Sequence, residues 1–176
     1  MNNHLRRIFT HRILKCKLDR NGILKMKGEK MLNNKIAEEI DYQLILNIWE
    51  KSVIATHDFL NPEDILFYKN KIPAFLNYLE LRIWFLNEEP IGFSGTNKEE
   101  LDMLFLDPSK IGGGYGHQIF SWLLDNKNIY KVDVNEQNEH AKNFYLKHNY
   151  EVKSRSERDS FNKPYPILHL ERKRVL

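Results

Sequence analysis

The chain has 176 residues, of which 41% are hydrophobic and 29% are charged. This length suits one domain with a short appendage, and the composition excludes a chain that is disordered throughout. No apolar run approaches the ~20 residues that a membrane helix needs. The single cysteine, Cys16, excludes an intrachain disulfide framework and a zinc site with several thiolates. We therefore expect a cytoplasmic protein with no metal and no membrane partner.

Charge is divided unevenly along the chain. Residues 1–30 carry nine Lys and Arg against two Asp and Glu, whereas residues 31–176 carry eighteen against twenty-two. The basic leader shows no sustained hydrophobic period and lacks the apolar segment of a secretory signal, although its composition is faintly similar to a transit peptide. We expect a disordered extension, or upstream sequence before a start at Met31, in front of a single domain over residues 31–176. A nucleic-acid-binding function would depend on this leader alone, and we predict no nucleic-acid partner.

The first half of the domain is predicted to be mainly helical. A weak strand over residues 31–37 precedes a helix that Asp41 caps and that runs to about residue 56, because apolar side chains recur there at helical spacing. Asn61 caps a second helix, with proline in its first turn and acidic residues after it. Pro73 bends or ends that helix.

The second half alternates strands and helices. Short turns join three predicted strands, at residues 81–86, 91–95 and 101–106, which indicates an antiparallel meander. The glycines of the second strand weaken it. After a loop over residues 107–116, the pattern predicts a helix around Phe120, a strand at 130–134, a helix at 136–148 and closing strands at 151–157 and 166–171. This order of elements predicts an α+β fold.

A glycine-rich loop, Ile111-Gly-Gly-Gly-Tyr-Gly116, lies between a predicted strand and a predicted helix. Glycines let a backbone approach a ligand closely, and successive amides at a helix start bind anions such as a diphosphate. An ordinary glycine-rich turn is the alternative. The loop is not a Walker motif, because no Lys-Ser/Thr pair follows Gly116, and the hairpin-linked strands before it fit a Rossmann unit poorly.

A second motif begins at Asn135, where a predicted strand ends. Asn138, Ala141, Phe144 and Tyr145 follow at helical spacing, so their side chains share the helix face directed toward the glycine loop. An ordinary amphipathic helix with both aromatic side chains in the core would show the same spacing.

Together, the two motifs resemble the Gcn5-related N-acetyltransferase family over essentially all of residues 31–176. Gly114 and Gly116 match the family's acetyl-CoA motif, Arg/Gln-x-x-Gly-x-Gly/Ala, although Ile111 stands where Arg or Gln is usual. Four further stretches resemble a bacterial subgroup regarded as protein-lysine or small-amine acetyltransferases: residues 52–60, 133–138, 155–157 and 164–166. The resemblance implies mixed αβα layers around a central, mostly antiparallel sheet with splayed strands.

The resemblance also implies site residues. The amide of Leu104 or Phe105 would stabilise the oxyanion, and Tyr145 would be the general acid that protonates the departing thiolate. The residues expected to bind acetyl-CoA are Leu104, Phe105, Leu106, Gly112, Gly113, Gly114, Tyr115, Gly116, His117, Asn135, Asn138 and Phe144. The general base is left open between His57 and Asp102, with Asp58 as a further candidate. The residues expected to bind the acceptor amine are His57, Asp58, Asp159 and Tyr165.

These residues predict an N-acetyltransferase that passes the acetyl group of acetyl-CoA to a primary amine, on a protein lysine or a small molecule, by direct attack. The protein would be a monomer or a homodimer. The alternative is a non-catalytic acyl-CoA-binding protein or sensor. The presence of Tyr145 argues against the sensor, and the altered Ile111 slightly favours it.

Overall fold

The computed structural model describes residues 16–18, 24–26 and 31–173. The chain divides into two units, residues 1–31 and 32–176. In the first unit, β1 (Cys16–Leu18) pairs antiparallel with β2 (Leu24–Met26). These six residues belong to the predicted disordered extension over residues 1–30, which stays a prediction. The rest of the predicted disordered leader lies outside the described residues.

The second unit contains seven strands and five α-helices among its described residues. None of these helices is both long enough and apolar enough to cross a membrane. The elements are β3 (Leu32–Ile36), α2 (Tyr42–Thr56), α3 (Pro62–Lys71), α4 (Pro73–Leu76), β4 (Glu80–Leu86), β5 (Glu89–Asn97), β6 (Glu100–Leu106), α5 (Tyr115–Lys127), β7 (Lys131–Asn135), α6 (Glu139–Lys147), β8 (Tyr150–Ser156) and β9 (Ile167–Arg172). Short 3₁₀ turns at Glu39–Asp41 and Pro108–Lys110 precede α2 and the glycine loop.

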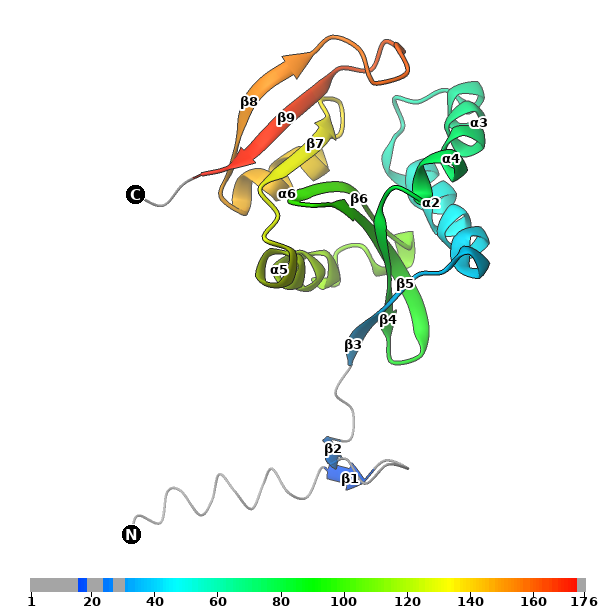
Figure 1. Cartoon of the computed structure of the whole chain (residues 1–176), viewed down its shortest axis with the longest axis vertical. Helices are drawn as coiled ribbons and strands as arrows, with labels where there is room; N and C mark the ends of the chain where they lie inside the picture. Colours follow the sequence, from blue (N-terminus) through cyan, green and yellow to red (C-terminus); the bar gives the residue numbers. More distant parts are fainter. Residues whose placement is uncertain (1–15, 19–23, 27–30, 174–176) are drawn as a thin grey trace. The chain divides into compact units, whose positions relative to one another are not determined.

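The seven strands form one sheet in the order β3-β4-β5-β6-β7-β9-β8 (Figure 1). Every neighbouring pair is antiparallel except β6 and β7. These two parallel strands pair only through Glu100 with Lys131 and Leu101 with Val132. Beyond these two pairs the strands separate. The predicted α+β fold, with a mostly antiparallel sheet and splayed strands, is confirmed.

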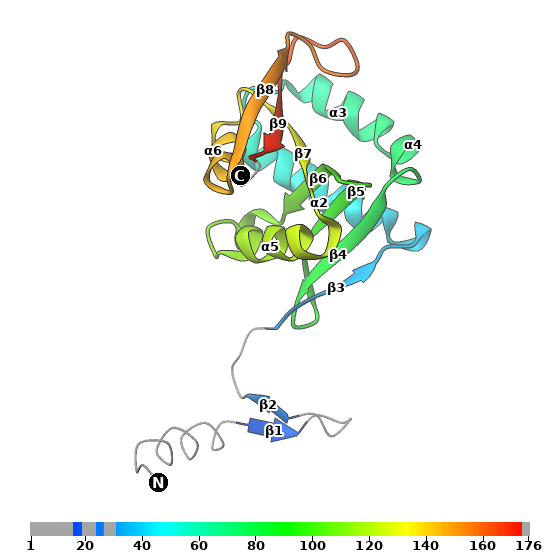
Figure 2. The ribbon, with the colours of Figure 1, turned by 60° about the vertical axis from the view of Figure 1, so that its left-hand side comes forward.

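Two hydrophobic clusters fill the two faces of the sheet. Because successive side chains of a strand point to opposite faces, β4 places Ile83 in one cluster with α2 and Trp84 in the other with α5. On β5, Phe93 also packs toward α2 and Ile91 toward α5, although regular alternation would put these two residues on one face; the register shift opposite Trp84 and Phe85 turns Ile91 to the other face. Helices α2 and α5 accordingly lie on opposite sides of β4 and β5 in the two views (Figures 1 and 2).

Two helix starts differ from prediction. Asp41 does not cap α2 with its side chain; its carboxylate accepts a hydrogen bond from the Glu38 amide at 3.0 Å and pairs with Lys35 at 2.8 Å, closing the 3₁₀ turn before the helix. Helix α6 begins at Glu139, three residues later than predicted, because Asn138 is its capping residue. By contrast, the cap predicted for α3 is confirmed by a hydrogen bond of 2.8 Å from the amide of Asp64 to the side chain of Asn61.

The glycines of β5 permit a close approach rather than a short strand. The strand extends two residues beyond the predicted 91–95 at each end. A Cβ atom at Gly92 would lie 2.6 Å from the carbonyl oxygen of Phe105 on β6. Glycine therefore lets β5 and β6 pack tightly at the end of β6, within the segment that no longer pairs with β7.

Candidate active site

A cavity of about 510 Å³ opens where β6 and β7 separate. Its walls come from the end of α2, from β6, from the glycine loop and the start of α5, and from β7 and α6. The lining residues are Ser52, Thr56, His57, Leu101, Asp102, Leu104, Phe105, Leu106, Ile111, Gly112, Gly114, Gly116, His117, Asp133, Val134, Asn135, Asn138, His140, Ala141, Phe144 and Tyr145. The two sequence motifs, whose nearest residues Gly116 and Asn135 are nineteen positions apart in the chain, therefore line one cavity.

The glycine loop leads directly into α5. Gly112 and Gly114 have φ values of +82° and +79°, a region that side chains other than glycine rarely adopt. Gly114 is the residue before α5, so the first helical turn, with Gly116 and His117, begins beside the cavity. A Cβ atom built at Gly114 meets nothing within 4 Å, which shows that this part of the backbone is open.

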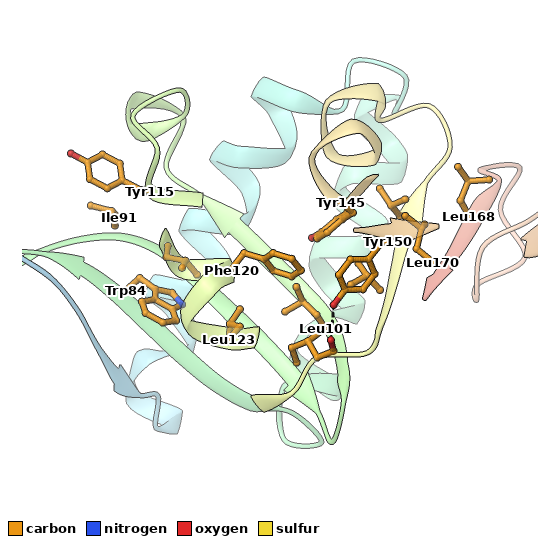
Figure 3. Close-up of a cluster of buried hydrophobic side chains, with 14 of the residues drawn as sticks. Trp84, Ile91, Leu101, Tyr115, Phe120, Leu123, Tyr145, Tyr150, Leu168 and Leu170 are labelled. Atoms are coloured by element: carbon orange, nitrogen blue, oxygen red, sulfur yellow. Dashed lines mark hydrogen bonds between the residues drawn. The ribbon is translucent and has the colours of Figure 1, made fainter. Parts of the chain in front are cut away.

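Gly113 and Tyr115 are the two predicted coenzyme-binding residues that do not line the cavity. Tyr115 is buried in the hydrophobic cluster beneath α5 (Figure 3). A Cβ atom at Gly113 would lie 2.7 Å from the Tyr115 ring, so this glycine packs against the tyrosine. All the other residues predicted to bind acetyl-CoA line the cavity.

The structure distinguishes the two backbone amides considered for the oxyanion. The amide of Asp107, directly after β6, donates to the carbonyl of Ile91 on β5 at 2.8 Å. Amides of an extended strand alternate sides, so the amide of Phe105 also points toward β5. The amide of Leu104 points the other way, into the gap between β6 and β7.

Tyr145 projects from α6 into the region between the cavity and the core (Figure 3). Its side chain is 7% exposed, and its ring packs edge-on against Phe120 and Phe144. Its hydroxyl makes no hydrogen bond with a described residue. Burial, with a smaller contribution from Tyr150, raises the pKa of the Tyr145 phenol above its ordinary value of 10. The phenol therefore carries its proton at neutral pH.

Hydrogen bonds fix His57 in one neutral form. The Thr56 hydroxyl donates to the carbonyl of Ser52 at 2.7 Å and lies 2.8 Å from His57 Nδ1. The hydroxyl can therefore accept the Nδ1 hydrogen, which leaves a lone pair on Nε2. The amide nitrogen of Asn138 lies 3.4 Å from this Nε2, while the other end of the Asn138 side chain caps α6. Burial lowers the pKa of His57 to about 4.

Two carboxylates stand at the point where the strands part. Asp102 and Asp133 each follow the last residue through which β6 and β7 pair with each other, and both line the cavity. Asp102 has no partner on β5, where the register shifts, so it forms a β-bulge. Burial, followed by the charges of Glu100 and Asp133, raises the pKa of Asp102 to about 6. His169 donates from Nδ1 to Asp133 at 2.7 Å when Asp133 is ionised.

Three predicted acceptor-binding residues lie outside the cavity. Asp58 is an exposed turn residue after α2. Asp159 accepts hydrogen bonds from Tyr68 on α3 and from two amides of its own loop. The Tyr165 hydroxyl donates to Asp64 on α3 at 2.5 Å. Asp159 and Tyr165 thus fasten the loop between β8 and β9 to α3.

Several lining residues were not predicted from the sequence. Ser52 and Thr56 belong to the last turns of α2, within the stretch 52–60 that resembles the bacterial subgroup, and Asp133 belongs to a short strand. Asp133 does fall within a stretch that resembles the bacterial subgroup, but only the strand pairing reveals that it faces Asp102. Within the described parts of the chain, no three His, Cys, Asp or Glu side chains are grouped as metal ligands would be.

The fold, the cavity and the loop at the start of α5 define an acyltransferase of the Gcn5-related N-acetyltransferase family, to which this chain belongs. It is 39% identical over 129 residues to the peptidyl-lysine N-acetyltransferase YjaB of Escherichia coli, matching 72% of this chain and 86% of that protein. It is 35% identical over 143 residues to the Salmonella typhimurium protein of the same name, matching 80% and 97%.

Solved structures agree with this assignment. The solution structure of apo-form YjaB from Escherichia coli superposes with a TM-score of 0.73 at 33% identity, covering 80% of this chain and 97% of that one. The PaiA N-acetyltransferase of Thermoplasma acidophilum, solved in complex with coenzyme A, superposes at 0.59 and 18% identity, covering 80% and 99%, which supports the fold alone. A comparison with models of protein families found no match.

Proposed function

We propose that the protein transfers the acetyl group of acetyl-CoA directly to a primary amine. The observation that supports this proposal is the cavity that joins the glycine loop and the start of α5 to Tyr145 and Asp102. A diphosphate placed at the start of α5 accepts hydrogen bonds from the loop and first-turn amides. The acyl end of an extended coenzyme then reaches the gap between β6 and β7.

The proposed reaction uses groups on both sides of the gap. The amine nitrogen attacks the thioester carbonyl, and the resulting oxyanion accepts a hydrogen bond from the amide of Leu104. The carbon–sulfur bond then breaks, and Tyr145 protonates the departing thiolate. Because burial raises the pKa of this phenol, the proton moves to sulfur only as negative charge develops there. The phenolate then regains a proton from solvent, and the general base releases to solvent the proton that it accepted from the amine.

Asp102 is better suited than His57 to accept the proton of the attacking amine. Basicity follows the pKa of the protonated form, which is about 6 for Asp102 and about 4 for His57. A general base functions best when its pKa is near the working pH. We therefore assign the base to Asp102, acting directly or through water, and assign to His57 the shaping of the cavity wall.

For the acceptor we propose the ε-amine of a protein lysine. Both curated relatives carry the name peptidyl-lysine N-acetyltransferase, and each is at least 35% identical to this chain. The paired carboxylates Asp102 and Asp133 attract an ammonium group to the cavity before it loses its proton. A small-molecule amine is the alternative acceptor that the same charges would admit.

The experiment measures free thiol released from acetyl-CoA by the full chain. Lysine-containing peptides, the same peptides with arginine in place of lysine, and small primary amines serve as acceptors, and calorimetry measures coenzyme A binding separately. Release that depends on lysine supports the proposal. Release with small amines alone would overturn the protein-lysine acceptor. Tight binding without release from any acceptor would instead indicate a non-catalytic acyl-CoA sensor.

A further inference from the structure

A pair of histidines connects the glycine loop's helix to α6. His117 lies in the first turn of α5 and lines the cavity, whereas His148 directly follows α6. Nδ1 of His117 lies 2.7 Å from Nε2 of His148, and Nδ1 of His148 lies 2.7 Å from the carbonyl oxygen of Phe144. Phe144 and Phe120 pack against the His148 ring, with ring centroids 4.3 and 4.9 Å away.

These contacts determine where the hydrogens lie. A carbonyl oxygen only accepts, so Nδ1 of His148 carries a hydrogen. In neutral His148, Nε2 is then an acceptor, and it must receive a hydrogen from Nδ1 of His117. Neutral His117 consequently has a lone pair on Nε2, and this nitrogen has no hydrogen-bond partner among the described residues. A lone pair cannot bind a phosphate oxygen, whereas a protonated Nε2 can donate to one.

We propose that His117 binds the diphosphate of the coenzyme as an imidazolium, with His148 as its positioning residue, so that coenzyme binding takes up one proton. The inference rests on the coenzyme site proposed above. In the bound state, Nε2 of His117 donates to a phosphate oxygen, and Nδ1 keeps its hydrogen bond to His148. The proton comes from the solvent, and no covalent bond changes.

The surroundings of His117 favour this proton only when an anion is present. In the free protein, the positive end of the α5 dipole opposes a cation in the first helical turn. A bound diphosphate reverses the sign of this local field. The loop offers no other cation for the phosphates, because Ile111 is apolar and Lys110 pairs with Glu89 at 2.8 Å. The other titratable side chains that line the cavity are His57, Asp102, Asp133, His140 and Tyr145. Besides His117, the rings that pack on His148 are those of Phe120 and Phe144, which carry no charge.

Calorimetric titration with coenzyme A tests the proposal. Binding enthalpies are measured at one neutral to mildly alkaline pH in buffers of different ionisation enthalpy, and the slope gives the number of protons taken up. Dephospho-coenzyme A serves as a second ligand, because it lacks the phosphate monoester that itself titrates near pH ~6. For both ligands we expect uptake approaching one proton, and a dissociation constant that rises by up to about tenfold per pH unit.

Variants identify the group that takes up the proton. His117→Gln keeps a polar side chain that cannot be protonated, and it should abolish the uptake. His148→Leu should reduce both uptake and affinity, whereas His148→Gln, whose amide oxygen can accept from His117, should restore part of each. His169→Gln, which removes a histidine outside the cavity, should leave the proton count unchanged. Thermal unfolding verifies that each variant is folded.

The outcomes are distinguishable. Binding with a buffer-independent enthalpy, or full uptake in His117→Gln, would refute the role of the histidine pair while leaving the coenzyme site intact. No binding of coenzyme A to the folded wild-type protein would refute the coenzyme site and the proposed function with it.

Discussion

Replacing Tyr145 with phenylalanine should separate chemistry from stability, because Tyr150 provides a matched control. The two rings lie 6.3 Å apart between their centroids, but their hydroxyl groups have different surroundings (Figure 3). The Tyr145 hydroxyl lacks a hydrogen-bond partner among the described residues. The Tyr150 hydroxyl donates to the carbonyl of buried Ile129 at 2.6 Å.

The two variants should have opposite effects: Tyr145→Phe should lower kcat with little change in stability, and Tyr150→Phe should lower stability with little change in kcat. Tyr145→Phe removes no hydrogen bond between described residues, so the free energy of unfolding should change by less than about 0.5 kcal/mol. Loss of the general acid should lower kcat by roughly 10²–10⁴-fold, with the KM for acetyl-CoA nearly unchanged. Tyr150→Phe leaves the Ile129 carbonyl unsatisfied at a cost of about 1–3 kcal/mol, while kcat should stay near that of the wild type. For a protein of this size, each kcal/mol lowers the thermal midpoint by about 2–4 °C.

Steady-state thiol release and thermal unfolding of both variants measure these effects. Because the Tyr145 phenol stays protonated at ordinary assay pH, Tyr145→Phe should lower the rate at every pH rather than shift the pH profile. A kcat within about threefold of the wild type, well below the expected loss, would remove Tyr145 from the mechanism. Equal losses of kcat in the two variants would show that disturbed packing, rather than a missing acid, explains the result.

Three further changes test other parts of the site and fold. Gly114→Val should weaken coenzyme A binding at least about tenfold by calorimetry, because it places a side chain in the open anion path and strains a positive φ. The fold raises the pKa of Asp102 from 3.8 to about 6, so its ionisation destabilises the folded state as the pH rises through this window. Asp102→Asn should therefore raise the thermal midpoint above pH ~6 but not near pH ~4, and it should remove the acidic limb of the rate profile. Hydrogen bonds from Lys163 and Tyr165 lower the pKa of Asp64 below 3.8, so Asp64→Asn should lower the midpoint at neutral pH, and the difference should vanish in acid, where the carboxylate is protonated.

The local elements could largely be predicted from the sequence because their signals are local. Hydrophobic spacing indicates α2, and the Asn61-Pro62 pair indicates the start of α3. The predicted helix boundaries were less accurate where a capping side chain determines at which turn the helix begins, as Asn138 does at α6. The family resemblance predicted many of the residues that line the cavity, since the glycine loop and the α6 row are contiguous motifs.

The acceptor side could not be predicted to the same extent. Asp102 and Asp133 face each other only because β6 and β7 pair through two residues and then part, and no local pattern encodes where two distant strands separate. Tyr165 stands in a stretch that resembles the subgroup and Asp159 lies between two such stretches, but their partners on α3 are distant in the chain. The histidine pair was missed for the same reason, since His117 and His148 are 31 residues apart.

The brief pairing of β6 with β7 leaves two unpaired strand edges inside a sheet. Exposed edges on the outside of a protein attract other strands and promote aggregation. Here the edges face each other across a cavity, where an elongated ligand with its own amide groups can pair with both. Unpaired backbone therefore lies inside the sheet as well as along the outer strands β3 and β8. The amide hydrogens of Leu104 and Leu106, which point into the gap, should exchange rapidly in the free protein and slow when the gap is filled, whereas that of Phe105, which faces β5, should stay protected. Ligand occupancy would then determine how cooperatively the two halves of the sheet unfold.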